Sequence, residues 1–499
     1  MEFDYVVVGA GAAGCVVASR LAADPRRTVL LAEAGGRPRS PFISIPKGFY
    51  YTLRGDRYLY RYPAGAGEVW LRGKVLGGSA AVNGMMWIRG APADWDGLNL
   101  PGWGWADIGP AYQAIEREIG VSTPPATEIT GAVLSSAASY GWAVTADFNS
   151  RDTERIGLTP SSIASGKRVT SYSTMIRSAE KRPNLAVAAR TPVASLVFDG
   201  RRVRGVRVRG GGEIRARKEV IVCAGAIETP LLLERSGIGH PDTVRRAGAV
   251  PVAESPNVGE RLIEQRGLSL QVRLDRGPGI TPARQAAAAV RYAATRRGLL
   301  ATGGYDLVCQ FKSRPDIGRP DVQGLFAPLA LDTSSEVMKP ARHPGILFMG
   351  YPIRPETASS VHSSGPDPGD PPVIDARYLE TASDRDSAAP VLDIARAVLR
   401  QGPLADRVLV EEFPGPSVGT PEKAVEYSRD YGSGIYHGVG SAAMGPDGAD
   451  VTDPRLRVRG VTGLRVADAS VLPSQVSGNT AAPAMAVGWR AADFILEEY

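Results

Sequence analysis

The stretch "DYVVVGAGAAGCVVASRLAADPRRTVLLAEAGG", residues 4–36, decides the fold. Its apolar run at residues 5–8 predicts a buried strand, and the apolar spacing after the glycines, up to about residue 22, predicts a helix. A further apolar run at residues 28–31 predicts a second strand that leads to Glu33. The stretch therefore predicts a strand, a glycine turn, a helix and a parallel strand, which together open a nucleotide-binding sheet.

The three glycines of this turn have separate expected tasks. Gly9 permits the turn, Gly11 lets the backbone approach a pyrophosphate, and Gly14 allows the helix to pack closely on the strand. The helix N-terminus then offers free N–H groups to an anion. Glu33, 24 residues after Gly9, can accept hydrogen bonds from both ribose hydroxyls, which favours FAD or NAD over a 2′-phosphorylated cofactor. If the turn existed for packing alone, Glu33 would be a solvated strand-end charge.

A second glycine-rich stretch, "GKVLGGSAAVNGMMWIRG", covers residues 73–90. Residues 77–79 can begin a helix with bare N–H groups, because the apolar residues at 80–82 and 85 follow at helical spacing. The stretch therefore predicts a second contact to an anion or a flavin.

The rest of the chain returns to the same sheet after an interruption. Residues 220–223 predict a buried strand and residues 226–235 a helix closed by Gly237. From about residue 267 to 419, alternating strands mix with amphipathic helices, which predicts a second domain with an antiparallel sheet, inserted into the first. The last stretch predicts a strand, a loop and a helix from about residue 482 that complete the nucleotide-binding domain.

Composition excludes several classes of protein. The net charge of +6 comes from 50 scattered arginines against 8 lysines, so we expect no nucleic-acid partner. No apolar run approaches the ~18 residues that cross a bilayer. The three cysteines lie far apart without metal-ligand spacing, so we expect neither a disulfide framework nor a metal site. A strand begins after four residues, leaving no room for a signal peptide, and we expect a cytoplasmic protein.

Four blocks together resemble the glucose-methanol-choline (GMC) family of FAD-dependent oxidoreductases. They are "GAGAAGCVVASRLA…VLLAEAG", "GKVLGGSAAVNGMMWIRG", "AGAIETPLLLERSGIG" and "YHGVGSAAMG…VADASVLPSQVSGNTAAPAMAVGWRAADFI", and their order and spacing also match. The resemblance implies an α/β fold: a Rossmann-like FAD-binding domain with an inserted α+β substrate domain built on an antiparallel sheet. It divides the chain into 1–266 for FAD, with flavin-lid and connecting segments at about 35–180, then 267–425 for substrate, and 426–499 for the return to the FAD domain.

The resemblance also implies the site residues. His437 of "YHGVG" matches the family's catalytic histidine, and Asn479 of "SGNT" matches a second position that relatives fill with His or Asn. Besides Gly9, Gly11, Gly14 and Glu33, it implies non-covalent FAD contacts for Ala12, Ala13, Ala34, Leu76, Gly78, Asn83, Gly84, Met86, Val193, Ala224, Asp468, Ala469 and Thr480. Three of these residues also have a structural interpretation. His437 can be a hydrogen-bonded imidazole without a catalytic role, Asp468 a loop cap and Asn479 a turn asparagine.

The chemistry expected of this pair is the oxidation of a small neutral alcohol. A base with a pKa near neutrality must take the hydroxyl proton while the α-carbon hydride leaves for the flavin, and a neutral His437 suits that task. Asn479 can hold the substrate oxygen. The electron acceptor is expected to be O₂ or an unidentified carrier. The other histidines, at 240, 343 and 362, are expected on the surface or at caps.

Two departures from the family pattern stand out. Some members bind FAD covalently through a histidine before the asparagine of the glycine-rich block, whereas this chain has Val82, so we expect dissociable FAD. Relatives often carry Asp-His where this chain has Glu264 and Gln265, which puts that contact in doubt. Two alternatives stay open: a lyase or light-driven decarboxylase on the same scaffold, although residues 321–326 lack the arginine expected for a carboxylate, and a nucleotide-binding structural protein.

Overall fold

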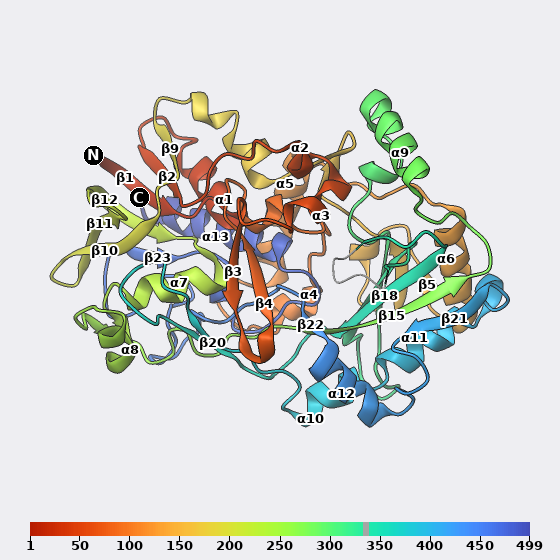
Figure 1. The fold of residues 1–499 in the computed structure, drawn as a ribbon. Helices are drawn as coiled ribbons and strands as arrows, with labels where there is room; N and C mark the ends of the chain where they lie inside the picture. The colour runs from red at the N-terminus through yellow and green to blue at the C-terminus, as the bar shows by residue number, and fades with distance from the viewer. Residues whose placement is uncertain (333–338) are drawn as a thin grey trace.

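The computed structural model describes residues 1–332 and 339–499, which form two lobes side by side (Figure 1). The lobe that holds both termini is built on a seven-stranded sheet. Five strands run parallel: β1 (Glu2–Val8), β2 (Val29–Glu33), β9 (Leu185–Ala189), β12 (Glu213–Val222) and β23 (Leu464–Val466). β10 (Val193–Asp199) and β11 (Arg202–Val208) continue the sheet in antiparallel fashion. The Rossmann-like expectation is confirmed.

Two helices from opposite ends of the chain pack against each other beside this sheet. α1 (Ala12–Leu21) follows the first glycine turn, and α13 (Ala481–Glu498) is the C-terminal helix. Small residues allow the close contact: a Cβ on Gly488 of α13 would lie 2.6 Å from the carbonyl oxygen of Ala13. The N- and C-terminal segments therefore share one core, as the sequence predicted.

The second lobe is built on an eight-stranded sheet. Its order is β21 (Val408–Phe413), β15 (Arg266–Leu274), β18 (Gly345–Pro352), β17 (Val322–Ala327), β16 (Leu307–Phe311), β6 (Arg155–Leu158) and β5 (Ala143–Val144), with β22 (Ser433–Gly434) beside β15. All neighbours are antiparallel except β5 and β6. Alternate residues of these strands form an apolar core with α6 (Glu128–Tyr140), α11 (Val391–Leu399) and part of α12 (Pro421–Tyr431).

The antiparallel sheet is not confined to the inserted region. The expected substrate range 267–425 contains β15 to β18 and β21, but β5 and β6 come from residues 143–158 and β22 from 433–434. These strands have two to four residues, too few for an alternating pattern to be seen in the sequence. The chain therefore enters the second lobe before the insertion and leaves it after.

The second glycine-rich stretch forms a turn and not the helix that its spacing predicted. Residues 78–81 make one 3₁₀ turn, preceded by Gly77 at φ +101°. The buried guanidinium of Arg168 donates to the carbonyl oxygens of Ala80 and Asn83, which a continuing helix would use for its own N–H groups. Met85 then adopts φ +67° and turns the chain away. The expectation missed this distant arginine.

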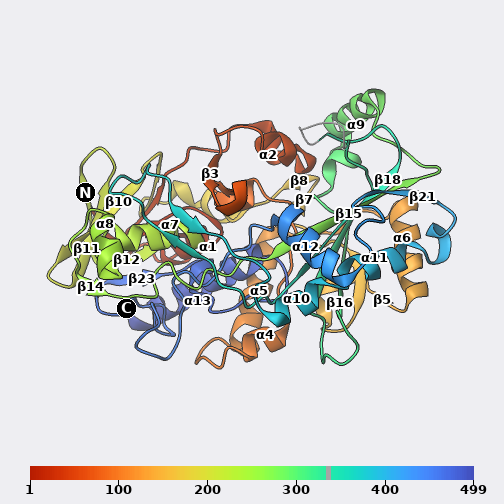
Figure 2. The same ribbon diagram turned by 60° about the horizontal axis from the view of Figure 1, so that its bottom comes forward.

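Smaller elements join and cover the lobes. The hairpin of β3 (Leu59–Pro63) and β4 (Val69–Gly73), with the short helices α2 (Pro41–Ser44) and α3 (Phe49–Thr52), lies between them. α9 (Pro282–Thr295) stands away from the second lobe in both views (Figures 1 and 2). The other α-helices of the described ranges are α4 (Pro92–Asp96), α5 (Trp105–Ile119), α7 (Gly225–Glu234), α8 (Pro241–Arg246) and α10 (Ala382–Ala388). Within the described ranges, the chain forms no helix that is long and apolar enough to span a bilayer.

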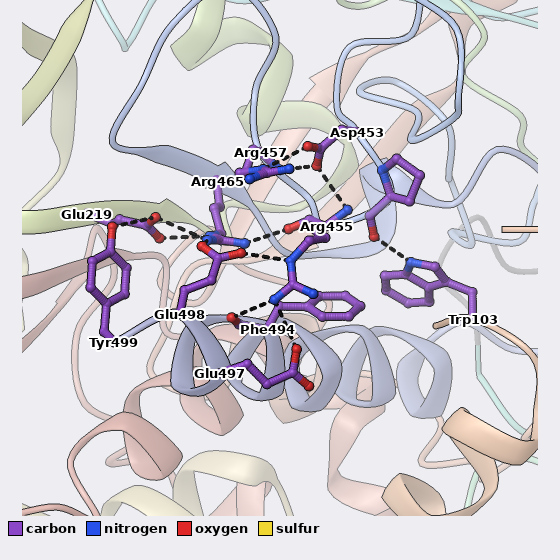
Figure 3. A network of polar contacts seen from close by, with 11 residues as sticks. Trp103, Glu219, Asp453, Arg455, Arg457, Arg465, Phe494, Glu497, Glu498 and Tyr499 are labelled. Atoms are coloured by element: carbon purple, nitrogen blue, oxygen red, sulfur yellow. Dashed lines mark hydrogen bonds and ion pairs between the residues drawn. The ribbon is translucent and has the colours of Figure 1, made fainter. Parts of the chain in front are cut away.

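A network of charges holds the end of α13 (Figure 3). Arg465 of β23 is fully buried and pairs with Glu219 of β12, whose carboxylate lies 2.7 Å from its Nε, and with Glu498. Arg455 pairs with Glu497 and Glu498. The last turn of the C-terminal helix is thus tied to two strands of the first sheet.

Candidate active site

One cavity of about 850 Å³ runs along the carboxyl ends of the parallel strands and reaches the second sheet. Its lining begins with Glu33 at the end of β2 and the glycine turn before α1, and it ends at His437 and Asn479. Crevices at the carboxyl ends of such strands are where open α/β sheets bind ligands. The polar groups predicted at distant points of the chain therefore meet in one space.

The first glycine turn has the geometry of a phosphate cradle. Gly9 has φ +99°, and a Cβ there would lie 2.3 Å from the carbonyl oxygen of Cys223. A Cβ on Gly14 would lie 1.9 Å from the carbonyl oxygen of Gly9, which explains the close packing of helix on strand. Gly11 caps α1 without a side-chain hydrogen bond, and a Cβ there would meet nothing within 4 Å. Its open side faces the cavity.

Glu33 is buried beside this cradle. Its carboxylate accepts hydrogen bonds from the N–H groups of Ala10 at 2.9 Å and Gly35 at 2.7 Å. Burial raises the pKa of Glu33 to about 7, against the lowering effect of these two hydrogen bonds. The alternative of a solvated strand-end charge is wrong, because the side chain is held in place and lines the cavity.

Most of the expected cofactor residues line the cavity. They are Gly9, Gly11, Ala12, Ala13, Glu33, Ala34, Gly78, Asn83, Gly84, Met86, Val193, Ala224, Asp468, Ala469 and Thr480. Gly14 and Leu76 stand behind the lining: Gly14 packs against Gly9, and Leu76 is fully buried in the core of the first lobe.

Asp468 also caps backbone groups, as its structural alternative proposed. One carboxylate oxygen accepts from Gly225 N at 2.8 Å and from the hydroxyl of Thr229 at 2.7 Å, and the other accepts from Ser470 N at 2.8 Å. The carboxylate therefore joins the start of α7 to the loop after β23. This link shapes the cavity wall, since Gly225 and Asp468 both line it.

His437 projects into the far end of the cavity with both ring nitrogens in contact. Nδ1 lies 2.7 Å from Oε1 of Gln265, and Nε2 lies 3.1 Å from Nδ2 of Asn479. The backbone on either side is fixed by Glu264, which accepts from the N–H groups of His437 and Gly438. Tyr436, the preceding residue, has φ +66°, an uncommon conformation that turns the imidazole toward the cavity.

The electrostatics keep this imidazole neutral. Burial, and then the charge of Arg72, lower the pKa of His437 from 6.5 to about 3. Arg72 in turn pairs with the fully buried carboxylate of Glu264 at 3.3 Å. At neutral pH the imidazole is therefore uncharged and one ring nitrogen keeps its lone pair, but its pKa lies below the near-neutral value that the sequence led us to expect of the base.

The surroundings of this pair are mostly apolar. Side chains from both lobes line this end of the cavity, among them Phe49, Met86, Tyr305, Leu325, Met349 and Ile435. Asn479 Nδ2 also lies 3.9 Å from the sulfur of Met86. The site thus presents the polar atoms of His437 and Asn479 in a largely apolar chamber.

Gln265 is the site residue that sequence reasoning did not assign. Its block was noted only as a departure from the family pattern, yet it provides the side chain that touches Nδ1 of His437. Among the other histidines, His240 caps α8 as expected, but the surface position expected of His362 is wrong. His362 lies between Glu234 at 2.7 Å and Glu260 at 3.1 Å, with 14% of its side chain exposed.

The sequence matches a known protein family over most of its length. Residues 3–266 and 355–488 match the N-terminal and C-terminal models of a family described as GMC oxidoreductase. The chain is 35% identical over 527 aligned positions to an uncharacterized GMC-type oxidoreductase of Mycobacterium tuberculosis, with 99% of each chain covered. It is 31% identical to an oxygen-dependent choline dehydrogenase of Vibrio vulnificus, covering 100% of this chain and 95% of the relative.

Solved structures share this fold over the whole chain. A pyridoxine 4-oxidase from Mesorbium loti superposes with a TM-score of 0.88 at 26% identity, with 100% of both chains covered. A formate oxidase from Aspergillus oryzae RIB40, carrying the mutation R554A, superposes with a TM-score of 0.89 at 24% identity, over 100% of this chain and 98% of that one. At 24% identity, the similarity to the formate oxidase shows a shared fold and nothing more.

Proposed function

The chain belongs to the GMC oxidoreductase family, and from this premise we propose that it uses FAD to oxidise the CH–OH group of a small neutral alcohol to a carbonyl. The observation that carries the proposal is the 3.1 Å contact between Nε2 of His437 and Nδ2 of Asn479. The pair lies at the apolar end of a cavity whose other end is a dinucleotide cradle. Relatives of the chain include enzymes named as alcohol and choline dehydrogenases.

The lining residues fit FAD. Gly11 leaves open space beside the uncapped N-terminus of α1, where a pyrophosphate gains from free N–H groups and the helix dipole. Glu33 lies where it can accept from ribose hydroxyls. When bound, the flavin supplies the acceptor of a hydride. We propose that the other lining residues expected from the sequence contact the cofactor.

His437 and Asn479 have different roles toward the substrate in this proposal. Neutral His437 removes the hydroxyl proton at Nε2, and Asn479 donates through Nδ2 to the substrate oxygen, which positions the α-carbon and stabilises the developing negative charge. The apolar walls exclude water, which strengthens both contacts. A neutral substrate fits them, because a charged one would lose hydration without a partner.

Anaerobic mixing with a panel of alcohols tests this proposal. We expect neutral primary or secondary alcohols, aromatic ones included, to bleach the oxidised flavin absorbance, whereas charged alcohols of similar size react at least 10-fold more slowly. Admitting O₂ afterwards separates an oxidase, which recovers its colour rapidly, from a dehydrogenase that needs another carrier. If no alcohol bleaches the flavin, the proposal fails and the lyase or light-driven alternative gains.

Binding of FAD without a covalent bond is part of the proposal. Val82 lines the cavity in front of Asn83, and its side chain has no atom that could bond to the flavin. We expect acid precipitation to leave all yellow colour in the supernatant, as free FAD by mass spectrometry. Flavin that stays with the precipitated chain would contradict this.

We propose a cytoplasmic location, supported by its cysteines. Cys15, Cys223 and Cys309 are all buried and free. Unpaired thiols are typical of reducing compartments. Fractionation of the source cells with an antibody against the chain tests this location, and recovery outside the cytoplasm would contradict it.

A further inference from the structure

A row of polar side chains crosses the second sheet toward the candidate active site. The strand register places Arg155 of β6 beside Gln310 of β16, and Gln310 beside Gln323 of β17. Gln323 is in turn paired with Tyr351 of β18. Directly opposite residues of neighbouring strands have side chains on the same face, close enough to bond. All four are nearly completely buried, with Arg155 the most exposed at 4%.

The row is linked by hydrogen bonds in one direction. Nη2 of Arg155 donates to Oε1 of Gln310 at 2.9 Å, and Nε2 of Gln310 donates to Oε1 of Gln323 at 3.0 Å. Nε2 of Gln323 then donates to Oδ1 of Asn479 at 3.1 Å and to the hydroxyl of Tyr351 at 2.5 Å. We call Arg155, Gln310 and Gln323 the amide row.

The two ends of the chain of bonds determine this direction. A guanidinium has only donors, so Gln310 must turn its oxygen toward Arg155, and each following amide inherits the same sense. At the other end, Nε2 of Gln265 donates to the carbonyl oxygen of Ile353 at 3.0 Å, which has only acceptors. Gln265 must therefore turn its oxygen toward Nδ1 of His437.

We propose that the amide row and Gln265 are positioning residues that fix the orientation of Asn479 and the tautomer of His437. Asn479 is held with Nδ2 toward the histidine, because its oxygen is occupied by Gln323. Nδ1 of His437 carries the proton, because it faces an acceptor on Gln265. The lone pair of Nε2 then accepts from Nδ2 of Asn479 and faces the cavity, where a substrate hydroxyl can reach both groups. This inference rests on the proposed role of His437 as the base.

The choice of glutamine has a consequence that a carboxylate would not have. Gln265 fixes the tautomer without adding negative charge, so it does not stabilise an imidazolium. The base therefore stays neutral in the resting enzyme although Glu264 is the adjacent residue, since that carboxylate is engaged by Arg72 and by backbone N–H groups.

Nitrogen NMR of the FAD-loaded protein tests the tautomer without any substrate. The chain has four histidines, so labelling with ¹⁵N-histidine gives four imidazole patterns, and loss of one in His437→Asn identifies the site. We expect His437 to be a single form protonated at Nδ1, the minor form of imidazole in water. Protonation at Nε2, or rapid averaging of the two forms, would overturn the proposal.

Two matched variants test the cause. Gln265→Met keeps the length of the side chain and removes the acceptor, so we expect the Nδ1-protonated form to be lost and kcat to fall roughly 10²-fold. Gln271→Met is the control: Gln271 is equally buried on β15, but its amide bonds to Leu331 and Glu412. The control keeps the wild-type signals of His437, although the signal of His343 can shift because His343 contacts Glu412. If Gln265→Met also keeps the wild-type signals of His437, the proposal is wrong.

The far end of the chain of bonds needs its own reporter. Six asparagines allow the side-chain amide of Asn479 to be followed by ¹⁵N-asparagine labelling. In Gln323→Met we expect this amide to lose its single slowly exchanging pair of signals and kcat to fall more than KM changes; unchanged signals would overturn the role of the row. If no alcohol is oxidised while the tautomer is as expected, the proposed function fails and the positioning role stands. If alcohols are oxidised but the tautomer of His437 is unchanged in Gln265→Met, the positioning role fails and the proposed function stands.

Discussion

At the scale of single residues, His437 and Asn479 have different expected shares in turnover. Removing a general base costs about 10²- to 10⁴-fold in rate, so His437→Ala is expected to lose this much in kcat while FAD stays bound. Asn479→Ala should cost about 10²- to 10³-fold, as loss of a donor to a developing oxyanion does. Stopped-flow reduction of the flavin by the best alcohol measures both.

A suitable control for these two variants is His240→Ala, since His240 caps an exposed helix away from the cavity. It should react as the wild type does. Near-normal reduction in His437→Ala would show that the imidazole is only structural.

The buried position of His437 also predicts a pH dependence. Because its pKa falls to about 3, the imidazole stays uncharged at pH 5. We therefore expect kcat/KM not to fall around pH 6.5 as the solution is acidified. Stability should respond instead: the unfolded histidine takes up a proton near pH 6.5 and the folded one only near pH 3, so the free energy of unfolding falls as pH drops through this window.

Urea unfolding at a series of pH values, compared between wild type and His437→Gln, measures this linkage. The variant should lose less stability on acidification than the wild type. An acid limb of kcat/KM at pH 6.5 that belongs to the free enzyme would contradict the neutral, buried base.

The sequence located both residues of the pair but not their support. His437 and Asn479 were found through short blocks whose order matches a family. Gln310 and Gln323 sit in short apolar strands, where a lone glutamine has no pattern of its own. Their roles follow from strand register, which one sequence does not specify.

At the scale of elements, the first glycine turn allows a test with a built-in control. A Cβ on Gly14 would clash with the backbone of Gly9, so Gly14→Ala should lower the Tm of the protein by several degrees and lower its FAD content. Gly11→Ala meets open space, so the chain should fold with nearly the same Tm after removal of FAD and bind FAD more weakly. Calorimetry and flavin titration measure the two effects.

If Gly11→Ala bound FAD as the wild type does, the pyrophosphate would have to lie elsewhere. Equal Tm values for the two variants would contradict the packing role of Gly14.

Elements were predictable where hydrophobic periodicity was long. β1, α1, β2, α7 and α13 agree with the expected strands and helices within one to three residues at most ends. The short turn at residues 78–81 and the strands β5 and β6 were not foreseen. Their formation depends on partners far along the chain, such as Arg168 for the turn and β16 for β6.

At the scale of the whole molecule, the charge network around α13 links the ends of the chain. Arg465→Ala would leave Glu219, itself buried, without its charged partner, and removing one member of a buried pair costs about 3–5 kcal/mol. Arg457→Ala removes a neighbouring pair with Asp453 that is half exposed at the arginine, and it should cost less than about 1 kcal/mol. Urea unfolding of both variants gives the difference, and equal values would mean that the network does not support the fold.

The position of β23 beside β12 has a consequence for synthesis of the protein. Residues 464–466 complete a sheet whose first strand is residues 2–8, and α13 covers α1. A ribosome needs roughly 25 to 100 s to make 499 residues at ~5–20 residues per second. For almost all of that time β12 lacks β23 as a neighbour, and the apolar face of α1 that α13 covers is exposed. The finished cavity, whose lining includes Asn479 and Ala484, therefore exists only once this C-terminal stretch has been made, so the cofactor cannot reach its final setting before then.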